Sequence, residues 1–226
     1  YKNELITFPK KFDHILEKIQ ALNNPKIELI YDHQINNINQ FTYFVNDIIL
    51  PNYNRPNEIM VIEVDHVFRA DQIEIALHEF TSQGHISAST RQIEIWKGFK
   101  HRVPERNNRT GVVLWNMKKI SRLPDTQRQA DFVGISKLKS EVHNLGFAVS
   151  KHVMYWKHMT ALGFSQVIED SQPVEDWYEK KWLNWDSVRN NKDLEISQGY
   201  EHLIPLAIPY NIEQLPKSIY QRIKEV

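Results

Sequence analysis

Residues 60–68, Met60-Val61-Ile62-Glu63-Val64-Asp65-His66-Val67-Phe68, form an apolar run that ends at two acids one residue apart, followed by a histidine. Apolar runs of this length are typical of buried strands, and open α/β sheets bind ligands beyond the carboxyl ends of their strands. Two carboxylates there, with an imidazole beside them, would offer hard ligands to Mn²⁺ or Mg²⁺. The stretch therefore predicts a metal site at a sheet edge, as in a metal-assisted transferase or hydrolase.

The flanking sequence predicts alternating strands and helices. We expect strands over 5–8, 26–31 and 59–64 and helices over 12–22 and 38–50, where apolar residues recur at helical spacing. This β-α-β-α-β order is typical of an α/β fold with a mainly parallel, Rossmann-like sheet flanked by helices. A helix over 70–81 follows, and two strands over 93–96 and 111–116, joined by a long loop, predict an antiparallel addition.

Composition sets bounds on domains and partners. The 226 residues are 41% hydrophobic, enough for a core, and we expect a catalytic domain over 1–165 with a C-terminal extension over 166–226 packed on it. Lysine and arginine (28) balance aspartate and glutamate (28), which argues against nucleic acid as a partner. Without an apolar stretch of about eighteen residues or a signal peptide, the chain is predicted to be cytoplasmic, with no transmembrane segment.

Basic residues further along are candidates for the same crevice. The loop over 100–109 contains Arg102, Arg106 and Arg109, whose planar guanidinium groups suit phosphate recognition, although each is also an ordinary surface arginine by pattern. A neutral imidazole at His143 could complete a metal site begun by Asp65. We expect His66 to face away from the two acids, because side chains in a strand alternate with period two.

Taken in order, these motifs resemble the GT-A-fold glycosyltransferases, in particular bacterial family-two-like enzymes. Glu63-Val64-Asp65-His66-Val67 stands in the place of the family's Asp-x-Asp motif. The segment from His143 through Gly146-Phe147 to Met154-Tyr155-Trp156-Lys157 is similar to its histidine, glycine-aromatic and Met-x-x-Lys pattern. The resemblance spans residues 26–185. The family's opening Asp-Gly-Ser turn is not found, so either an N-terminal strand lies upstream or the relative is distant.

The resemblance implies transfer of a sugar from a nucleotide-sugar donor to a glycan, lipid or protein acceptor. Glu63, Asp65 and His143 would hold Mn²⁺ or Mg²⁺, which stabilises the departing diphosphate as a Lewis acid. Glu63 could also contact the nucleotide, together with the three arginines of the loop and Lys157. An inverting enzyme needs a carboxylate base. Asp125 is the first candidate and Asp131 the second, although Asp125 is also a plausible helix cap.

Two other functions remain open. A metal-dependent phosphoesterase would use Glu63, Asp65 and His143 with water as the nucleophile. A non-catalytic carbohydrate-binding domain would use the six tryptophans, since aromatic faces stack on sugar rings, although core packing is their usual role. The absence of a Gly-rich phosphate loop and of a Gly-x-Ser-x-Gly elbow argues against P-loop enzymes and serine hydrolases.

Overall fold

The computed structural model describes residues 13–28, 42–52, 56–63, 65–103, 110–124, 135–151, 153–155, 177–185, 208–217, 219 and 221. The chain divides into two compact units, residues 1–36 and 37–226. In the first, α1 (Asp13–Ala21) lies within the helix predicted over 12–22. It is followed by Asn23, whose positive φ of 44° is a conformation that commonly ends helices. The strand predicted over 5–8 lies outside the described residues, and residues 26–28 are not part of a strand.

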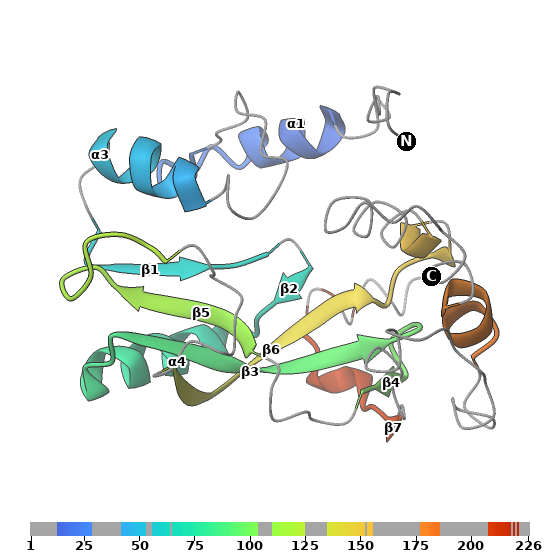
Figure 1. The fold of residues 1–226 in the computed structure, drawn as a ribbon. Coiled ribbons are helices and arrows are strands. Elements are labelled where there is room, and N and C mark those ends of the chain that lie inside the picture. The colour runs from blue at the N-terminus through green and yellow to red at the C-terminus, as the bar shows by residue number, and fades with distance from the viewer. Residues whose placement is uncertain are drawn as a thin grey trace, which may run out of the picture. The chain divides into compact units, whose positions relative to one another are not determined.

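The second unit is built on a curled, mixed sheet that is mostly antiparallel (Figure 1). Its described strands are β1 (Glu58–Val61), β2 (His66–Val67), β3 (Ser87–Trp96), β4 (His101–Arg102), β5 (Thr110–Asn116), β6 (Ser136–Phe147) and β7 (Ile208–Pro209). The strand order is β1-β5-β3-β4-β7, and β6 pairs with both β3 and β2. The described helical segments of this unit are η2 (Phe44–Ile49), α3 (Leu50–Asn52), α4 (Ala70–Gln83), η3 (Trp177–Leu183) and η5 (Ile212–Gln214).

The prediction of a mainly parallel sheet flanked by helices, and with it the GT-A architecture, is wrong. β1 pairs antiparallel with β5, with Ile59 opposite Trp115, and β5 pairs antiparallel with β3. Among the described strand pairs only β3 and β6 run parallel. Local periodicity indicates that a segment is a strand, but pairing depends on which apolar faces are buried together along the whole chain. The strand predicted to be third in a parallel series is thus an antiparallel neighbour of a later one.

β5 is buried on both of its faces. Leu114 packs with Phe80 of α4 on one side. Trp115, the next residue, packs with Val45 of η2 on the other. Because side chains alternate along a strand, a strand covered on both sides must be apolar at successive positions. This explains the continuous run Val112-Val113-Leu114-Trp115.

α4 also satisfies backbone groups of β6. The Lys139 N–H donates to Glu79 Oε2 at 2.9 Å, and the Glu141 N–H donates to Gln72 Oε1 at 2.9 Å. Side chains of α4 thus accept hydrogen bonds from backbone N–H groups of β6 that a neighbouring strand would otherwise accept. Covering strand groups with a helix in this way is one means by which proteins protect a sheet edge. These two contacts, one near each end of α4, hold the helix beside β6.

The described C-terminal segments pack on the β3–β6 half of the sheet. Trp182 and Trp185 form a buried cluster with Trp96, and Tyr210 packs with Ile95. Together with Trp115, these tryptophans are 1–6% exposed, so the four contribute to the core rather than to an exposed sugar-binding face. Trp156 and the side chain of Trp177 lie outside the described part.

No helix among the described residues is long and apolar enough to cross a membrane.

A buried asparagine joins η2 to the segment that follows β5. Asn46 Nδ2 donates to the Leu123 carbonyl oxygen at 2.9 Å, and the Leu123 N–H donates to Asn46 Oδ1 at 2.7 Å. We expect Asn46→Ala to lower the free energy of unfolding by about 2 kcal/mol, because it leaves two buried backbone groups without partners. Urea denaturation measures this change. The control is Asn52→Ala, which removes an exposed hydrogen bond to Ile48, and equal losses in both variants would contradict the expectation.

Candidate functional site

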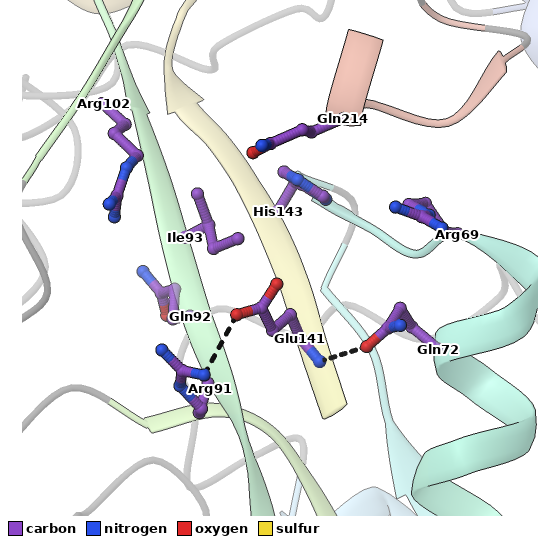
Figure 2. A pocket seen from close by; sticks show the side chains of 9 residues that line it. All are labelled: Arg69, Gln72, Arg91, Gln92, Ile93, Arg102, Glu141, His143 and Gln214. Atoms are coloured by element: carbon purple, nitrogen blue, oxygen red, sulfur yellow. Dashed lines mark hydrogen bonds and ion pairs between the residues drawn. The ribbon is translucent and has the colours of Figure 1, made fainter. Parts of the chain in front are cut away.

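A pocket of about 340 Å³ lies where the first turn of α4 faces strands β3, β4 and β6 (Figure 2). Three arginines from three different elements line it. Arg69 is the N-cap residue of α4, Arg91 is in β3 and Arg102 is in β4. The other lining residues are Gln72, Gln92, Ile93, Glu141, His143 and Gln214. The pocket is therefore polar, and three arginines and three glutamines make up two thirds of its nine lining residues.

The parallel pairing of β3 with β6 brings most of these side chains together. In its register Arg91 lies opposite Glu141 and Ile93 lies opposite His143. Residues two apart in a strand share a face, so all four side chains project toward the same side of the sheet. β4 adds Arg102 through its pairing with Ile95 of β3. The site thus depends on contacts between segments about fifty residues apart in the sequence.

The pocket has an excess of positive charge. Arg91 Nη1 lies 3.2 Å from Glu141 Oε1, and Arg69 makes hydrogen bonds of 2.9 and 3.0 Å with Asp71, which is half exposed and lies outside the lining. Arg102 forms no ion pair with any described residue. Three guanidinium groups against one carboxylate leave two positive charges among the lining groups. α4 begins at this pocket without a side-chain N-cap hydrogen bond, and Asp71 in its first turn offsets part of the positive end of its dipole.

His143 is a neutral member of this pocket. It is 2% exposed, and its Nε2 lies 2.7 Å from the hydroxyl of Tyr210. Burial lowers the pKa of His143 to about 4; the Val67 backbone opposes this shift and the Arg69 charge reinforces it. Burial also raises the pKa of Tyr210 to about 12. Both side chains are therefore uncharged at neutral pH, and the imidazole does not add to the charge of the arginines.

The two acids of the 60–68 stretch lie in a turn rather than in a strand. β1 ends at Val61, and the His66 N–H donates to the Glu63 carbonyl oxygen at 2.9 Å. This turn brings ligand atoms of Glu63, Asp65 and His66 within 4.8 Å of one another, a spacing that one metal ion could bridge. The expected alternation along a strand does not apply here. The structure therefore places His66, rather than His143, beside the two acids.

His143 and His66 lie on opposite faces of the sheet. His66 is paired with Asn144 and contacts its side chain, whereas His143 is the preceding residue of β6. Successive residues of a strand point to opposite faces. The metal group predicted from Glu63, Asp65 and His143 is thus divided between two places, with His143 in the arginine pocket.

The hydrogen bonds of His66 bear on whether its ring could bind a metal. Asn144 Oδ1 accepts the Gly146 N–H at 2.7 Å, which orients the amide so that its Nδ2 faces His66 Nε2 at 3.2 Å. An amide nitrogen only donates, so Nε2 accepts this hydrogen bond and its lone pair is engaged. Nδ1 is buried and has no hydrogen-bond partner among the described residues. A metal bound through Nε2 would require the Asn144 amide to turn away.

The other predicted site residues divide into two groups. Arg102 lies in the pocket, while Arg106, Arg109, Asp125, Asp131 and Lys157 lie outside the described residues.

Sequence reasoning missed Arg69, Arg91, Glu141 and the three glutamines. A short-range signal exists only for Arg69, which directly precedes a predicted helix. The others are isolated polar residues whose convergence depends on the β3–β6 register.

Comparison with known proteins gives no match: no family model, no curated protein and no solved structure is similar to this chain.

Proposed function

We propose that this protein binds a small phosphate-bearing ligand in the arginine pocket. The observation that supports this is the convergence of Arg69, Arg91 and Arg102 on one cavity of about 340 Å³. Guanidinium groups form bidentate, charge-assisted hydrogen bonds with phosphate oxygens, and helix N-termini favour anions. The volume is at the lower end of the range that small-molecule sites occupy.

The donors of the pocket favour a phosphate over a carboxylate. Asp71 offsets the charge of Arg69, which leaves one net positive charge, but the three guanidinium forks still suit the three terminal oxygens of a phosphate better than the two oxygens of a carboxylate. His143 stays neutral and does not change this balance at neutral pH. Arg102 has no acidic partner among the described residues, so it can engage a ligand without giving up an existing ion pair.

Metal-assisted transfer of a sugar stays a prediction. The sheet lacks the architecture from which that activity was inferred, and the acids lie near the turn between β1 and β2 rather than among the arginines. A phosphoesterase would also require the acids and His143 in one place. Phosphate recognition by arginines is the part of the predicted function that the pocket supports.

Removing Arg102 tests the proposal. We expect Arg102→Ala to weaken the binding of inorganic phosphate at least about tenfold, because a hydrogen bond to a charged group contributes about 1.5–3 kcal/mol. Isothermal titration calorimetry at low ionic strength measures the affinity. The matched control is Arg122→Ala, which removes an arginine paired with Asp47 outside the pocket.

Two results would contradict the proposal. One is a wild-type protein that does not bind phosphate at millimolar concentration. The other is an equal loss of affinity in the Arg122 variant, which would show that net charge rather than the pocket attracts the anion.

A further inference from the structure

The part of the pocket lining other than the arginines bears on the rest of the ligand. Beyond the arginines it consists of glutamine, glutamate and histidine side chains, and Ile93 is its only apolar residue among those described. No phenylalanine, tyrosine or tryptophan is among the described lining residues. Proteins commonly hold nucleobases by stacking them on aromatic faces. The described wall of this pocket does not offer that surface.

Some of these polar groups already have partners within the protein. Gln72 accepts the Glu141 N–H through Oε1 and donates to Asp71 through Nε2. His143 is held by the Tyr210 hydroxyl. These hydrogen bonds hold both side chains in place, so the two side chains shape the pocket.

Three other groups are placed to contact a ligand directly. Gln92 and Gln214 make no side-chain hydrogen bond with the described residues, and each amide can both donate and accept. Figure 2 shows the Gln214 side chain reaching from η5 toward β6. Glu141 approaches Arg91 through Oε1, and as a carboxylate it can only accept hydrogen bonds. A carboxylate beside the arginines suits an O–H donor of the ligand and repels a second phosphate.

We infer that the ligand is a sugar phosphate, meaning a phosphate ester whose remaining polar groups are mainly hydroxyls. The phosphate is held by Arg102 together with Arg69 and Arg91. The hydroxyls donate to Glu141 and exchange hydrogen bonds with Gln92 and Gln214. This inference rests on the proposed phosphate binding, and it adds that hydroxyl groups rather than a nucleobase complete the recognition.

The first experiment compares ligands that share a phosphate. Isothermal titration of the full chain at pH 7.5 uses inorganic phosphate, AMP and a panel of glucose 6-phosphate, fructose 6-phosphate and ribose 5-phosphate. At least one sugar phosphate should bind about tenfold or more tightly than inorganic phosphate, because two or more added hydrogen bonds contribute about 0.5–1.5 kcal/mol each. AMP should bind no more tightly than that sugar phosphate. Tighter binding of AMP, or equal binding of all five compounds, would overturn the inference.

The second experiment separates the hydroxyl contacts from the phosphate contacts. Gln214→Ala should weaken the binding of the preferred sugar phosphate about three- to tenfold more than it weakens the binding of inorganic phosphate. Gln214 is exposed on η5, so the variant should fold, which circular dichroism verifies. Gln83→Ala, at an exposed glutamine near the end of α4, is the matched control and should change neither affinity. An unchanged sugar-phosphate affinity in Gln214→Ala would count against the inference.

The two levels of the proposal fail in different ways. If inorganic phosphate does not bind, or binds independently of Arg102, the proposed function itself is wrong and the inference with it. If inorganic phosphate binds in an Arg102-dependent manner while the sugar phosphates gain nothing over it, only the inference is wrong.

Discussion

Replacing Gly111 with alanine should lower the free energy of unfolding by about 3 kcal/mol, at the upper end of the usual cost of overpacking a core. A Cβ atom at this position would lie 2.5 Å from Thr90 Oγ1, 2.6 Å from Val142 Cγ1 and 3.0 Å from the Thr90 carbonyl oxygen. Two of these contacts are shorter than side chains tolerate, and the third involves backbone. Gly111 is therefore required because β5 approaches its neighbours closely at this point.

The surroundings leave little room for relaxation. Thr90 is 2% exposed, its Oγ1 accepts the Val112 N–H at 3.0 Å, and it lies at the irregularity in the pairing of β3 with β5. Val142 is fully buried in β6. Relief of the clash would shift β3, which also carries Arg91 into the pocket. We therefore expect Gly111→Ala to weaken phosphate binding as well as stability.

Chemical denaturation of Gly111→Ala provides the measurement, and Gly98→Ala is its control. A Cβ at Gly98 would have no neighbour within 4 Å. The free energy of unfolding of Gly98→Ala should therefore fall by only about 1 kcal/mol, because alanine is strained at the left-handed φ of 88°. In a double-mutant cycle, Val142→Ala should recover part of the Gly111→Ala loss by removing one of the clashing groups. A loss below 1 kcal/mol in Gly111→Ala would show that the strands are not packed as described.

Lowering the pH from 7 to 4 should cost about 3 kcal/mol of stability through His143 alone. Its pKa is about 4 in the folded protein, against an ordinary value of 6.5. Between these values the unfolded chain binds a proton that the folded protein does not, so the unfolded state gains stability as the pH falls. The contribution of His143 is complete above pH 6.5, is lost as the pH falls toward 4, and changes no further below that value. The difference of about 2.5 pKa units corresponds to about 3 kcal/mol.

Carboxylates also titrate in acid, so the contribution of His143 must be isolated by difference. Urea denaturation of the wild type and of His143→Gln from pH 7 to pH 4 should show the two stabilities converging as the pH falls, because only the wild type has the imidazole. His78→Gln, at an exposed position of α4, is the control and should follow the wild type throughout. If the difference between wild type and His143→Gln does not change with pH, the imidazole is not held neutral by burial.

The pocket could be predicted only in part. The basic loop indicated phosphate recognition, and Arg102 lies in the pocket, but its partners Arg91 and Glu141 are fifty residues apart and belong to no motif. The two acids were predicted from an apolar strand running into them, whereas the strand ends at Val61 and a turn follows. Periodicity does not show where a strand gives way to a turn, because that depends on which neighbour accepts the next backbone hydrogen bond.

The sequence by itself determined several local elements of this protein. The helix predicted over 70–81 is α4, the strands predicted over 93–96 and 111–116 lie in β3 and β5, and the strand predicted over 59–64 forms β1 as far as Val61, because spacing of apolar residues depends only on neighbours along the chain. Only the tertiary structure decided the antiparallel order of the sheet, the separation of His143 from the two acids, and the meeting of three arginines. Strand pairing and register join residues far apart in the sequence, and they are set by burial of the whole chain at once.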